Sequence, residues 1–410
     1  MKNRGPLFFL SGFLIACGCQ HSFPDRAMWD GIVQLPDGIT VPFRMNLDLS
    51  GEKPAGYFLV GDEKTPIPEI SRNGDSLTLT YSEYSAEIRA TWNGSQLVGH
   101  YLRIRSDGTK SLHFTASPEV KSPNNSDPSL PSPQISGTYQ VLFQAEDKVD
   151  ATTAAKLWTK DGAVYGTFIA PDGDYGLLEG KPSGTRIQLS RFTGWQAIAI
   201  VLEQDAGTWS GTFYAASNAK PRPFVLQPRP DLNIPPPPSM RTAMKNPRAE
   251  FAFSGVSLSG ETVTDTDERF KGKALIVDIM GTWCHNCLDE APVLQRLQEQ
   301  FGKDGLEIVG LSFEISDDPA AARKNLQLYK NRFGLTYTLL FCGSLDDENV
   351  KKQIHSQLNN FFAYPTTIFI DKNHQVLTIH SGFKGPGTGD DFQRQIREFE
   401  ELAMKLVQSR

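Results

Sequence analysis

Residues 274–287 read Ala-Leu-Ile-Val-Asp-Ile-Met-Gly-Thr-Trp-Cys-His-Asn-Cys, and this stretch decides how the C-terminal part of the chain is expected to fold. Its first seven residues form an apolar run rich in Ile and Val, which is typical of a buried strand. The Gly-Thr-Trp that follows predicts a turn. From about Asn286 to Phe301 the pattern changes to that of a helix ending at Gly302. We therefore expect Cys284 and Cys287 at the start of a helix that follows a buried strand.

That position gives the two cysteines a defined chemistry. The N-terminus of a helix carries partial positive charge and unpaired N–H groups, which stabilise a thiolate. In a Cys-X-X-Cys sequence the first sulfur can attack a disulfide, and the second, one turn away on the same face, can resolve the mixed disulfide. We expect Cys284 to lie at the helix tip, open to solvent, and to attack, and Cys287 to resolve.

The composition of the whole chain excludes some functions. The 410 residues carry a net charge of −6, and 41 basic residues are scattered among 47 acidic ones, so no nucleic-acid surface is expected. The length allows two or three domains. Five cysteines are too few for a scaffold built on disulfides, and only Cys284 and Cys287 have a motif spacing. We expect neither a metal nor a cofactor. Cys342 is interpreted as a small packed hydrophobe, with a redox role as the alternative, and Cys19 has no assigned partner.

The N-terminus, residues 1–16, predicts a secretion signal, because Lys2 and Arg4 precede an apolar run that is too short to span a bilayer. Leu14-Ile15-Ala16-Cys17 resembles the lipobox of bacterial lipoproteins, in which the cysteine is lipid-modified and becomes the first residue. The resemblance implies a lipid anchor at Cys17 in the cell envelope, facing the periplasm. Gly18 is not the aspartate that commonly retains lipoproteins in the inner membrane, so an outer-membrane address is open. A plain signal peptide with a chance cysteine is the alternative.

Residues 28–227 consist of short β-like runs separated by Gly, Asp, Asn and Pro. A Pro-, Ser- and Asn-rich tract at 117–134 predicts a linker. Three landmarks recur in the same order at an offset of about 110 residues, which predicts a duplicated β module, 28–116 and 135–227, built as a sandwich or barrel of about nine strands. The landmark pairs are Gly56-Tyr57-Phe58 with Gly166-Thr167-Phe168, Asn73-Gly74-Asp75 with Ser183-Gly184-Thr185, and Val98-Gly99-His100-Tyr101 with Ser210-Gly211-Thr212-Phe213.

The β half contains no catalytic constellation. Its aromatic residues, such as Trp195 and Tyr175, could line a binding surface or pack in a core, and core packing is the favoured interpretation. The ligand of these modules, if they bind one, is not indicated.

A Pro-rich tract at 228–248 predicts a stiff, extended spacer that would hold the last domain away from the β half. From residue 249 to residue 410, strands and helices alternate, which is typical of an α/β domain. The fold class expected for the chain is therefore a duplicated all-β module followed by an α/β domain. The strands expected after residue 273 are 274–280, 306–313, 338–341, 366–370 and 375–380, and the helices are 286–301, 319–333, 346–361 and 390–407.

This last domain resembles the thioredoxin superfamily, and within it the envelope-anchored TlpA-like and ResA-like branch. Trp283-Cys284-His285-Asn286-Cys287 matches the W-C-x-x-C active site. Pro292 matches the proline that kinks the active-site helix, and Tyr364-Pro365-Thr366-Thr367 matches the cis-proline loop. The resemblance implies a thioredoxin fold with a redox-active Cys284–Cys287 disulfide. It also implies that the loop of Pro365 lies against the disulfide and receives the extended chain of a partner.

Two acids extend the match. Asp278, six residues before Cys284, matches the buried acid of thioredoxin itself, whereas the TlpA-like branch often has Asn there. Glu290 matches an acid that ResA-like members place beside the cysteines. A carboxylate on an apolar strand is costly and its pKa should rise, which suits Asp278 to accept the proton of Cys287. An exposed edge-strand position is the alternative for Asp278.

The residues expected to contact a partner chain are Trp283, His285, Asn286, Tyr364 and Thr366. His285 could add positive charge next to Cys284, and a stabler thiolate makes the disulfide more oxidising. A solvated histidine with a small effect is an equally open interpretation.

The favoured function is a membrane-anchored thiol–disulfide oxidoreductase that acts on cysteine-containing envelope proteins and exchanges electrons with an upstream thiol donor or acceptor. The β modules would serve as binding or spacer domains. One alternative is a peroxiredoxin-like peroxide reductase, although the P-x-x-x-T-x-x-C motif of that class is absent. The other is a ligand-binding lipoprotein with a passenger thioredoxin domain. The direction of electron flow is not indicated.

Overall fold

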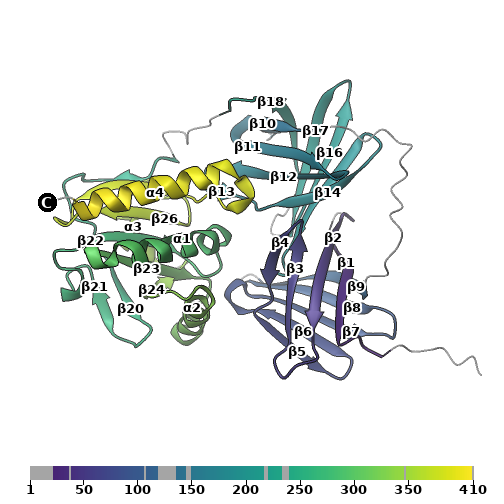
Figure 1. The fold of residues 1–410 in the computed structure, drawn as a ribbon, viewed down its shortest axis with the longest axis horizontal. Coiled ribbons are helices and arrows are strands. Elements are labelled where there is room, and N and C mark those ends of the chain that lie inside the picture. Colours follow the sequence, from purple (N-terminus) through teal and green to yellow (C-terminus); the bar gives the residue numbers. More distant parts are fainter. Residues whose placement is uncertain are drawn as a thin grey trace, which may run out of the picture.

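The computed structural model describes residues 22–36, 38–105, 108–118, 135–144, 149–216, 220–232, 240–345 and 348–408. Two β modules lie side by side with a domain of strands and helices (Figure 1). The expected fold class, two all-β modules followed by an α/β domain, is confirmed. The predicted signal sequence with Cys17 and Cys19, and residues 119–134 of the first linker, lie outside the described residues.

The first module is a nine-stranded antiparallel sheet in the order β4-β3-β2-β1-β9-β8-β7-β6-β5. Buried and more exposed residues alternate along β2, because successive side chains of a strand point to opposite faces. The sheet ends at β4 and β5, so the module is an open half-barrel. Its strands are β1 (Arg26–Gln34), β2 (Thr40–Asp48), β3 (Ala55–Val60), β4 (Glu63–Pro66), β5 (Glu69–Asn73), β6 (Ser76–Tyr81), β7 (Ala86–Trp92), β8 (Leu97–Arg105) and β9 (Gly108–Pro118).

The second module closes into a barrel. Its strands follow the order β11-β10-β18-β17-β16-β15-β14-β12, and β12 also pairs with β11, which completes the ring. The short β13 lies beyond β12. The strands are β10 (Gly137–Gln144), β11 (Val149–Lys160), β12 (Ala163–Ala170), β13 (Gly173–Asp174), β14 (Leu178–Ser183), β15 (Arg186–Phe192), β16 (Ala197–Asp205), β17 (Thr208–Ala215) and β18 (Arg222–Pro228).

The two modules share one strand order. In each, the first strand lies between the second and the ninth, and the ninth to the fifth then follow in descending order. The landmark glycines Gly56 and Gly166 both lie in the third strand of their module, β3 and β12. This common order supports the duplication that the sequence predicts. The modules differ in closure, because β14 pairs with β12 in the barrel, whereas the half-barrel stays open beside β5.

Side chains of the barrel fill the opening of the half-barrel. The ring of Phe192, at the end of β15, lies 5.0 Å from the rings of Phe43 and Phe58 and 5.2 Å from that of Tyr101. The hydroxyl of Tyr101 donates a hydrogen bond to the carbonyl of Trp195 over 2.6 Å. Trp195 is buried, so the favoured interpretation of this residue as core is confirmed. The turn between β15 and β16 therefore joins the two modules through a shared apolar core.

The C-terminal domain is built on a seven-stranded sheet in the order β21-β20-β24-β23-β22-β26-β27. In its centre, β22 runs parallel to β23 and antiparallel to β26, and all seven residues of β22 are buried. The strands are β20 (Ser254–Ser257), β21 (Thr262–Thr264), β22 (Ala274–Met280), β23 (Leu306–Glu314), β24 (Thr338–Ser344), β26 (Thr366–Ile370) and β27 (Val376–Ser381). The helices are α1 (His285–Phe301), α2 (Pro319–Phe333), α3 (Glu348–His355) and α4 (Asp390–Gln408).

Local signals account for most of these helix boundaries. Helix α2 begins with Pro319 in its first turn and is capped by the carboxylate of Asp318, which accepts hydrogen bonds from the backbone N–H groups of Ala320 and Ala321. It ends at Gly334, which adopts φ +62°. The expected helix 346–361 is too long, because α3 spans only Glu348–His355. The chain then forms β25 (Leu358–Asn359), which pairs with β19 (Ala243–Met244).

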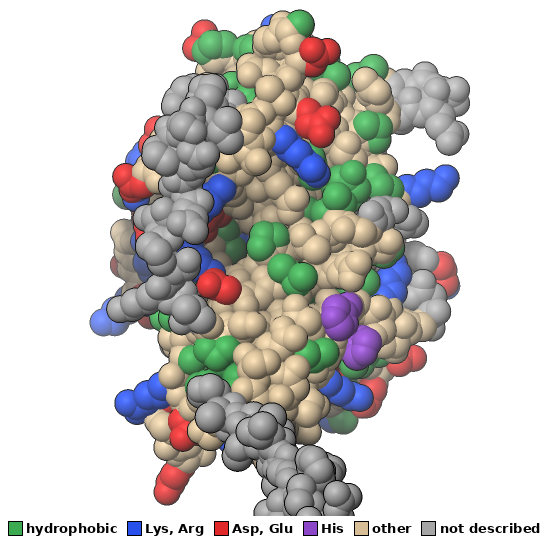
Figure 2. All heavy atoms as spheres, turned by 90° about the vertical axis from the view of Figure 1, so that its right-hand side faces the viewer, with side chains coloured by type: hydrophobic (Ala, Val, Ile, Leu, Met, Phe, Trp, Pro, Cys, Tyr) green, Lys and Arg blue, Asp and Glu red, His purple; other side chains and the backbone are tan. Residues whose placement is uncertain are grey.

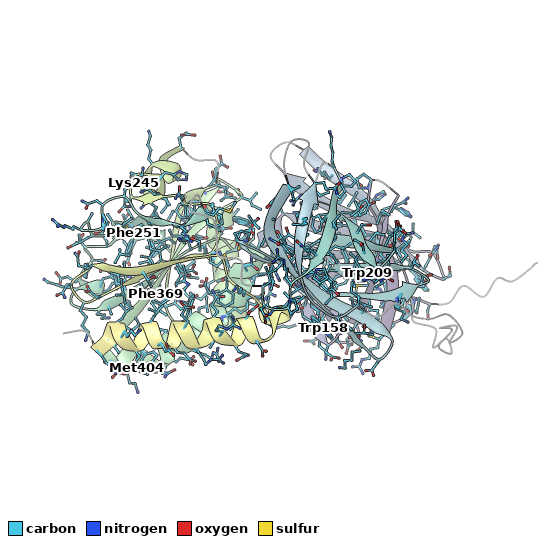
Figure 3. The ribbon with its side chains drawn as sticks, turned by 90° about the horizontal axis from the view of Figure 1, so that it is seen from above. Trp158, Trp209, Lys245, Phe251, Phe369 and Met404 are labelled. Carbon is cyan, nitrogen blue, oxygen red and sulfur yellow. The ribbon has the colours of Figure 1, made fainter. Side chains whose placement is uncertain are left out.

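The domain is packed against both β modules, so the expectation that the proline tract would hold it away from the β half is wrong. Ion pairs cross the contact from α4 and α2: Lys156 Nζ lies 2.6 Å from Asp391 Oδ2, and Arg332 Nη1 lies 3.6 Å from Glu83 Oε1. The view from above shows the two halves in contact along one face (Figure 3). The outer face of the β modules carries scattered charges of both signs (Figure 2).

Candidate active site

The turn that carries the cysteines is fixed from the neighbouring strand β23. Thr282 donates hydrogen bonds from its backbone N–H (3.1 Å) and its hydroxyl (2.6 Å) to the buried carboxylate of Glu314. The indole N–H of Trp283 donates to the carbonyl of Phe313 over 2.8 Å. A Cβ at Gly281 would lie 2.3 Å from that indole nitrogen, so the turn requires glycine there. Glu314 was missed from the sequence, although a carboxylate on an otherwise apolar strand, as at Asp278, could have indicated it.

Cys284 caps helix α1. Its sulfur accepts a hydrogen bond from the backbone N–H of Cys287 and donates one to the carbonyl of Tyr364, both over 3.3 Å. Cys287 lies one turn further on and is fully buried. Both are free thiols in this structure, so the disulfide between them stays a prediction. The expectation that Cys284 is open to solvent is wrong, because only 6% of the residue is exposed.

Two buried acids lie in the active site: Asp278 acts on the thiol of Cys287, and Glu290 is influenced by the charge of Cys284. Burial raises the pKa of Asp278 to about 8, and its Oδ1 has no hydrogen-bond partner among the described residues. The pKa of Glu290 is also raised well above its usual range, by burial and then by the charge of Asp278. One oxygen of Glu290 accepts a hydrogen bond from the hydroxyl of Thr367 over 2.6 Å. Burial likewise raises the pKa of Cys287, which therefore holds its proton unless a base removes it.

The loop of Pro365 lies directly beside Cys284. The Tyr364–Pro365 bond is cis, as the resemblance implies, and the carbonyl of Tyr364 is the one that binds the sulfur of Cys284. The rings of Trp283 and Tyr364 are 5.4 Å apart. Thr366 is fully buried and donates its hydroxyl to the carbonyl of Ala363. Its side chain therefore faces the interior, and the expectation that Thr366 contacts a partner chain finds no support in its position.

Residues of the barrel hold both central residues of the Cys-His-Asn-Cys sequence. The side-chain amide of Asn286 donates to the carbonyl of Asp172 over 3.1 Å. Next to it, Gly173 forms a parallel bridge with Phe383, and Asp174 accepts a hydrogen bond from the backbone N–H of Gly385 over 2.6 Å. The tip of the hairpin formed by β12 and β13 is thus hydrogen-bonded to the active-site side of the C-terminal domain.

His285 lies beneath an aromatic ring of the barrel. Its ring is 5.6 Å from that of Trp195, and its Nε2 is 3.4 Å from a carboxylate oxygen of Asp289. Burial, followed by the positive charge of Arg191, lowers the pKa of His285 to about 3. The histidine is neutral at physiological pH, so the expectation that it adds positive charge beside Cys284 is wrong.

An ion pair between the two β modules lies behind His285. Arg191 is 1% exposed and binds the carboxylate of Glu63 through two nitrogens, over 3.0 and 2.7 Å. Burial raises the pKa of Asp289 well above its usual range, and the charges of Asp174 and Glu63 raise it further. Sequence reasoning did not find this cluster, because its members come from three separate parts of the chain. Only the spacing of four residues between His285 and Asp289 on one helix face could have indicated a part of it.

Comparisons with known proteins match the C-terminal domain. The sequence profile of the AhpC/TSA family matches residues 247–379. The thioredoxin-like protein YneN of Bacillus subtilis is 30% identical over 130 residues, which are 32% of this chain and 68% of YneN. The thiol-disulfide oxidoreductase ResA of Geobacillus thermodenitrificans is 27% identical, over 32% of this chain and 66% of ResA. The thiol:disulfide interchange protein DsbE of Pseudomonas fluorescens is 38% identical, over 32% and 64%.

Among solved structures, a thiol:disulfide interchange protein of Chlorobium tepidum is 21% identical, with a TM-score of 0.30, over 40% of this chain and 99% of that one. The chain spans about two thirds of the length of the curated relatives YneN and ResA. Because the match to YneN reaches 30% identity over that share, the chain belongs to the thioredoxin-like family of thiol–disulfide oxidoreductases.

Proposed function

We propose that the protein exchanges disulfides with cysteine-containing proteins of the cell envelope through Cys284 and Cys287. The observation that carries the proposal is the arrangement at the start of α1. There Cys284 caps the helix, Cys287 lies buried one turn below, and a buried acid of raised pKa is nearby.

The chemistry proceeds in two steps when the reduced protein meets a partner disulfide. The thiolate of Cys284 attacks one partner sulfur, a Cys284–partner bond forms, and the second partner sulfur leaves as a thiolate that takes a proton from solvent. Cys287 then attacks the sulfur of Cys284 and releases the first partner sulfur. The proton of the Cys287 thiol passes to Asp278. We assign Asp278 as this base because its pKa of about 8 leaves a fraction of its carboxyl groups ionised near neutral pH. The reverse sequence oxidises a partner dithiol.

Burial of the active-site thiols favours a partner that presents its cysteine on an extended segment. The carbonyl of Tyr364 next to Pro365 lies against Cys284, so a segment bound along this loop would bring its sulfur to Cys284. We assign Trp283 and Tyr364, whose rings lie 5.4 Å apart, to the floor of that binding site.

The proposal includes a lipid anchor at Cys17 in the envelope, facing the periplasm, which rests on the Leu14-Ile15-Ala16-Cys17 sequence. Among the described residues, none of the helices is both long and apolar enough to span a bilayer. An anchored, oxidising location requires an upstream thiol donor if the protein acts as a reductant.

The test is a turnover assay with the purified full chain. Reduction of insulin disulfides by dithiothreitol should accelerate in the presence of the protein and lose that acceleration in Cys284→Ser. A matched Cys342→Ser control should keep it, because Cys342 has no hydrogen bond to Cys284 or Cys287 among the described residues and packs against the apolar cluster that includes Phe251 and Val263. The match to the AhpC/TSA family keeps a peroxide reductase as the second candidate. Oxidation of the reduced chain by hydrogen peroxide, together with no acceleration of insulin reduction, would select that candidate and refute disulfide exchange.

A further inference from the structure

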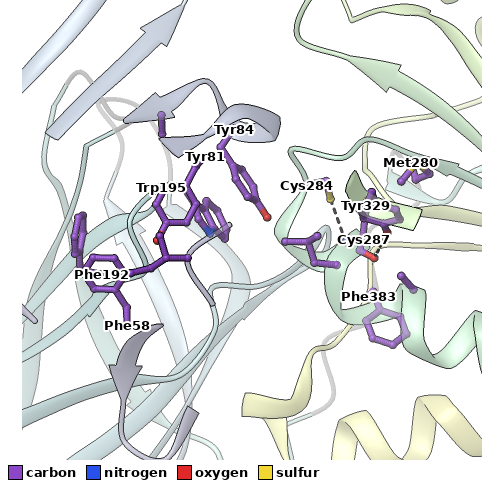
Figure 4. Close-up of a cluster of buried hydrophobic side chains, with 14 of the residues drawn as sticks. Phe58, Tyr81, Tyr84, Phe192, Trp195, Met280, Cys284, Cys287, Tyr329 and Phe383 are labelled. Carbon is purple, nitrogen blue, oxygen red and sulfur yellow. Dashed lines mark hydrogen bonds between the residues drawn. The ribbon is translucent and has the colours of Figure 1, made fainter. Parts of the chain in front are cut away.

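Tyr84 of the half-barrel lies at the surface where the β modules meet the active site. It ends a short 3₁₀ helix (Ser82–Tyr84) and is 3% exposed. Its ring stacks on that of Trp195 with centroids 3.9 Å apart and planes 3° from parallel. Trp195 in turn lies over His285. Figure 4 shows Tyr84 on the side of the β modules that faces Cys284, and the two groups are close enough for the charge of Cys284 to contribute, after burial, to the raised pKa of Tyr84.

That hydroxyl has no hydrogen-bond partner among the described residues, although it is buried. Buried polar groups in folded proteins are nearly always paired, so an unpaired one needs an explanation. The stack on Trp195 fixes the orientation of the ring, so the hydroxyl stays in the contact between the half-barrel and the active-site side of the C-terminal domain. The geometry indicates a partner that is present only in another state of the site.

Cys284 changes its hydrogen-bonding needs when it ionises. As a thiol it donates to the carbonyl of Tyr364 and accepts from the backbone N–H of Cys287. As a thiolate it can no longer donate, and the carbonyl oxygen of Tyr364 then opposes a negative sulfur. A second donor would replace the lost interaction and stabilise the charged form.

We propose that Tyr84 belongs to the active site and donates a hydrogen bond from its hydroxyl to the thiolate of Cys284. The β modules would then complete the active site of the C-terminal domain instead of acting as a spacer. The inference rests on the proposed function, in which Cys284 attacks as a thiolate. Burial raises the pKa of Tyr84 well above its usual range, so the phenol stays protonated and remains a donor.

Other charged or titratable groups surround Tyr84 and Cys284, and they come from the half-barrel and from helices α1 and α2. Glu83 and Arg332 lie beside Tyr84, from the half-barrel and from α2, and Asp289 faces it from α1. Glu290 of α1 and Cys287 face Cys284 from within the C-terminal domain. A substitution of Tyr84 by Phe leaves all of these groups in place and removes only the hydroxyl.

Tyr81 offers a matched control. It is buried to the same degree three residues earlier, and its hydroxyl also lacks a partner among the described residues. That hydroxyl, however, lies against the backbone of the barrel turn, where a Cβ at Gly194 would be 2.2 Å from it. Tyr81→Phe therefore removes an unpaired buried phenol from the same module without removing the donor proposed for Cys284.

The experiment measures how fast iodoacetamide alkylates Cys284 in the reduced full chain across a pH series, with the Cys284 peptide quantified by mass spectrometry. Alkylation consumes the thiolate, so the rate below the titration midpoint reports the thiolate fraction. In Tyr84→Phe we expect the pH profile to move up by about one unit and the rate at pH 7 to fall about tenfold, as for a lost hydrogen bond to a charged group. Tyr81→Phe should keep the profile of the unaltered chain. Coincident profiles for the unaltered chain and Tyr84→Phe would overturn the proposal.

A second variant covers the case in which Tyr84→Phe does not fold. Replacement of Tyr84 by 3,5-difluorotyrosine keeps the ring and makes the hydroxyl a stronger donor, so the profile should move to lower pH. An unchanged profile would refute the proposal. The readout needs no disulfide substrate and therefore separates the two claims. If Tyr84→Phe shifts the pH profile but the unaltered chain does not accelerate insulin reduction, the proposed function alone is refuted. If the unaltered chain accelerates insulin reduction but Tyr84→Phe leaves the profile unchanged, the role of Tyr84 alone is refuted.

Discussion

Replacement of Asp278 by Asn should stabilise the C-terminal domain at neutral pH and leave it unchanged in acid. The carboxyl group is 1% exposed, and its Oδ1 has no hydrogen-bond partner among the described residues. Burial raises its pKa from 3.8 to about 8, so the folded chain binds a proton that the unfolded chain releases between these values. The contribution of Asp278 to stability is therefore most favourable below pH 4 and becomes less favourable as the pH rises towards 8.

The size of the effect follows from the pKa shift. Between the usual value of 3.8 and pH 7 lie about three pKa units, each worth about 1.4 kcal/mol. Keeping Asp278 protonated at pH 7 therefore costs at most about 4 kcal/mol of the free energy of unfolding. Asn has nearly the shape of a protonated Asp and does not ionise, so Asp278→Asn should recover that amount at pH 7 and almost none at pH 4.

Hydrogen exchange of the backbone amides of β22, measured on the reduced full chain at pH 4 and pH 7, gives the opening free energy of this strand directly. This measurement also does not require the whole chain, which has two β modules and a C-terminal domain, to unfold in a single transition. Asp304→Asn is the control, because Asp304 is an exposed residue of a surface turn, and it should change the opening free energy by less than about 0.5 kcal/mol. Equal effects of Asp278→Asn at both pH values, or a loss of stability at pH 7, would show that Asp278 is ionised and paired in the folded chain.

Two further predictions concern the contact between the β modules and the anchoring of the chain. Glu63→Gln should destabilise the paired modules by about 3 kcal/mol in chemical denaturation, because it removes the carboxylate that binds the buried guanidinium of Arg191. Arg191→Met should cost less, since Glu63 is 35% exposed and can be hydrated; a larger cost for Arg191→Met would contradict the assigned burial. Cys17→Ala should release the protein from membranes without changing its disulfide-exchange rate, and retention of the variant in salt-washed membranes would argue against the lipid anchor.

Local sequence signals were sufficient for much of the C-terminal domain. Strand Ala274–Met280 and helix Pro319–Phe333 have the expected bounds, because an apolar run, a capping Asp318 and a terminal Gly334 act within a few residues. The end of the expected helix 346–361 was wrong for the opposite reason. There Leu358 and Asn359 pair with Ala243 and Met244, and no local pattern reports a partner so far away in the sequence.

The same distinction applies to the candidate site. The spacing of Cys284 and Cys287 indicated their proximity, and the resemblance to thioredoxin implied that Asp278 belongs to the same site. The environment of His285 depends on Trp195, which the barrel supplies from far away in the sequence. A histidine that adds positive charge beside Cys284, or a solvated histidine with a small effect, was a reasonable expectation for an isolated domain. Docking of the β modules changes it, because burial against an aromatic ring disfavours the imidazolium form.

The role of Cys284 as the attacking sulfur is tested most directly by trapping partners as mixed disulfides. Cys287→Ser should hold partner proteins through Cys284 as adducts that resist alkylation and release with dithiothreitol, since no second thiol resolves them. Cys284→Ser should trap almost none, because Cys287 is fully buried and burial raises its pKa well above the usual range. Equal trapping by the two variants, or preferential trapping through Cys287, would contradict the assignment of roles.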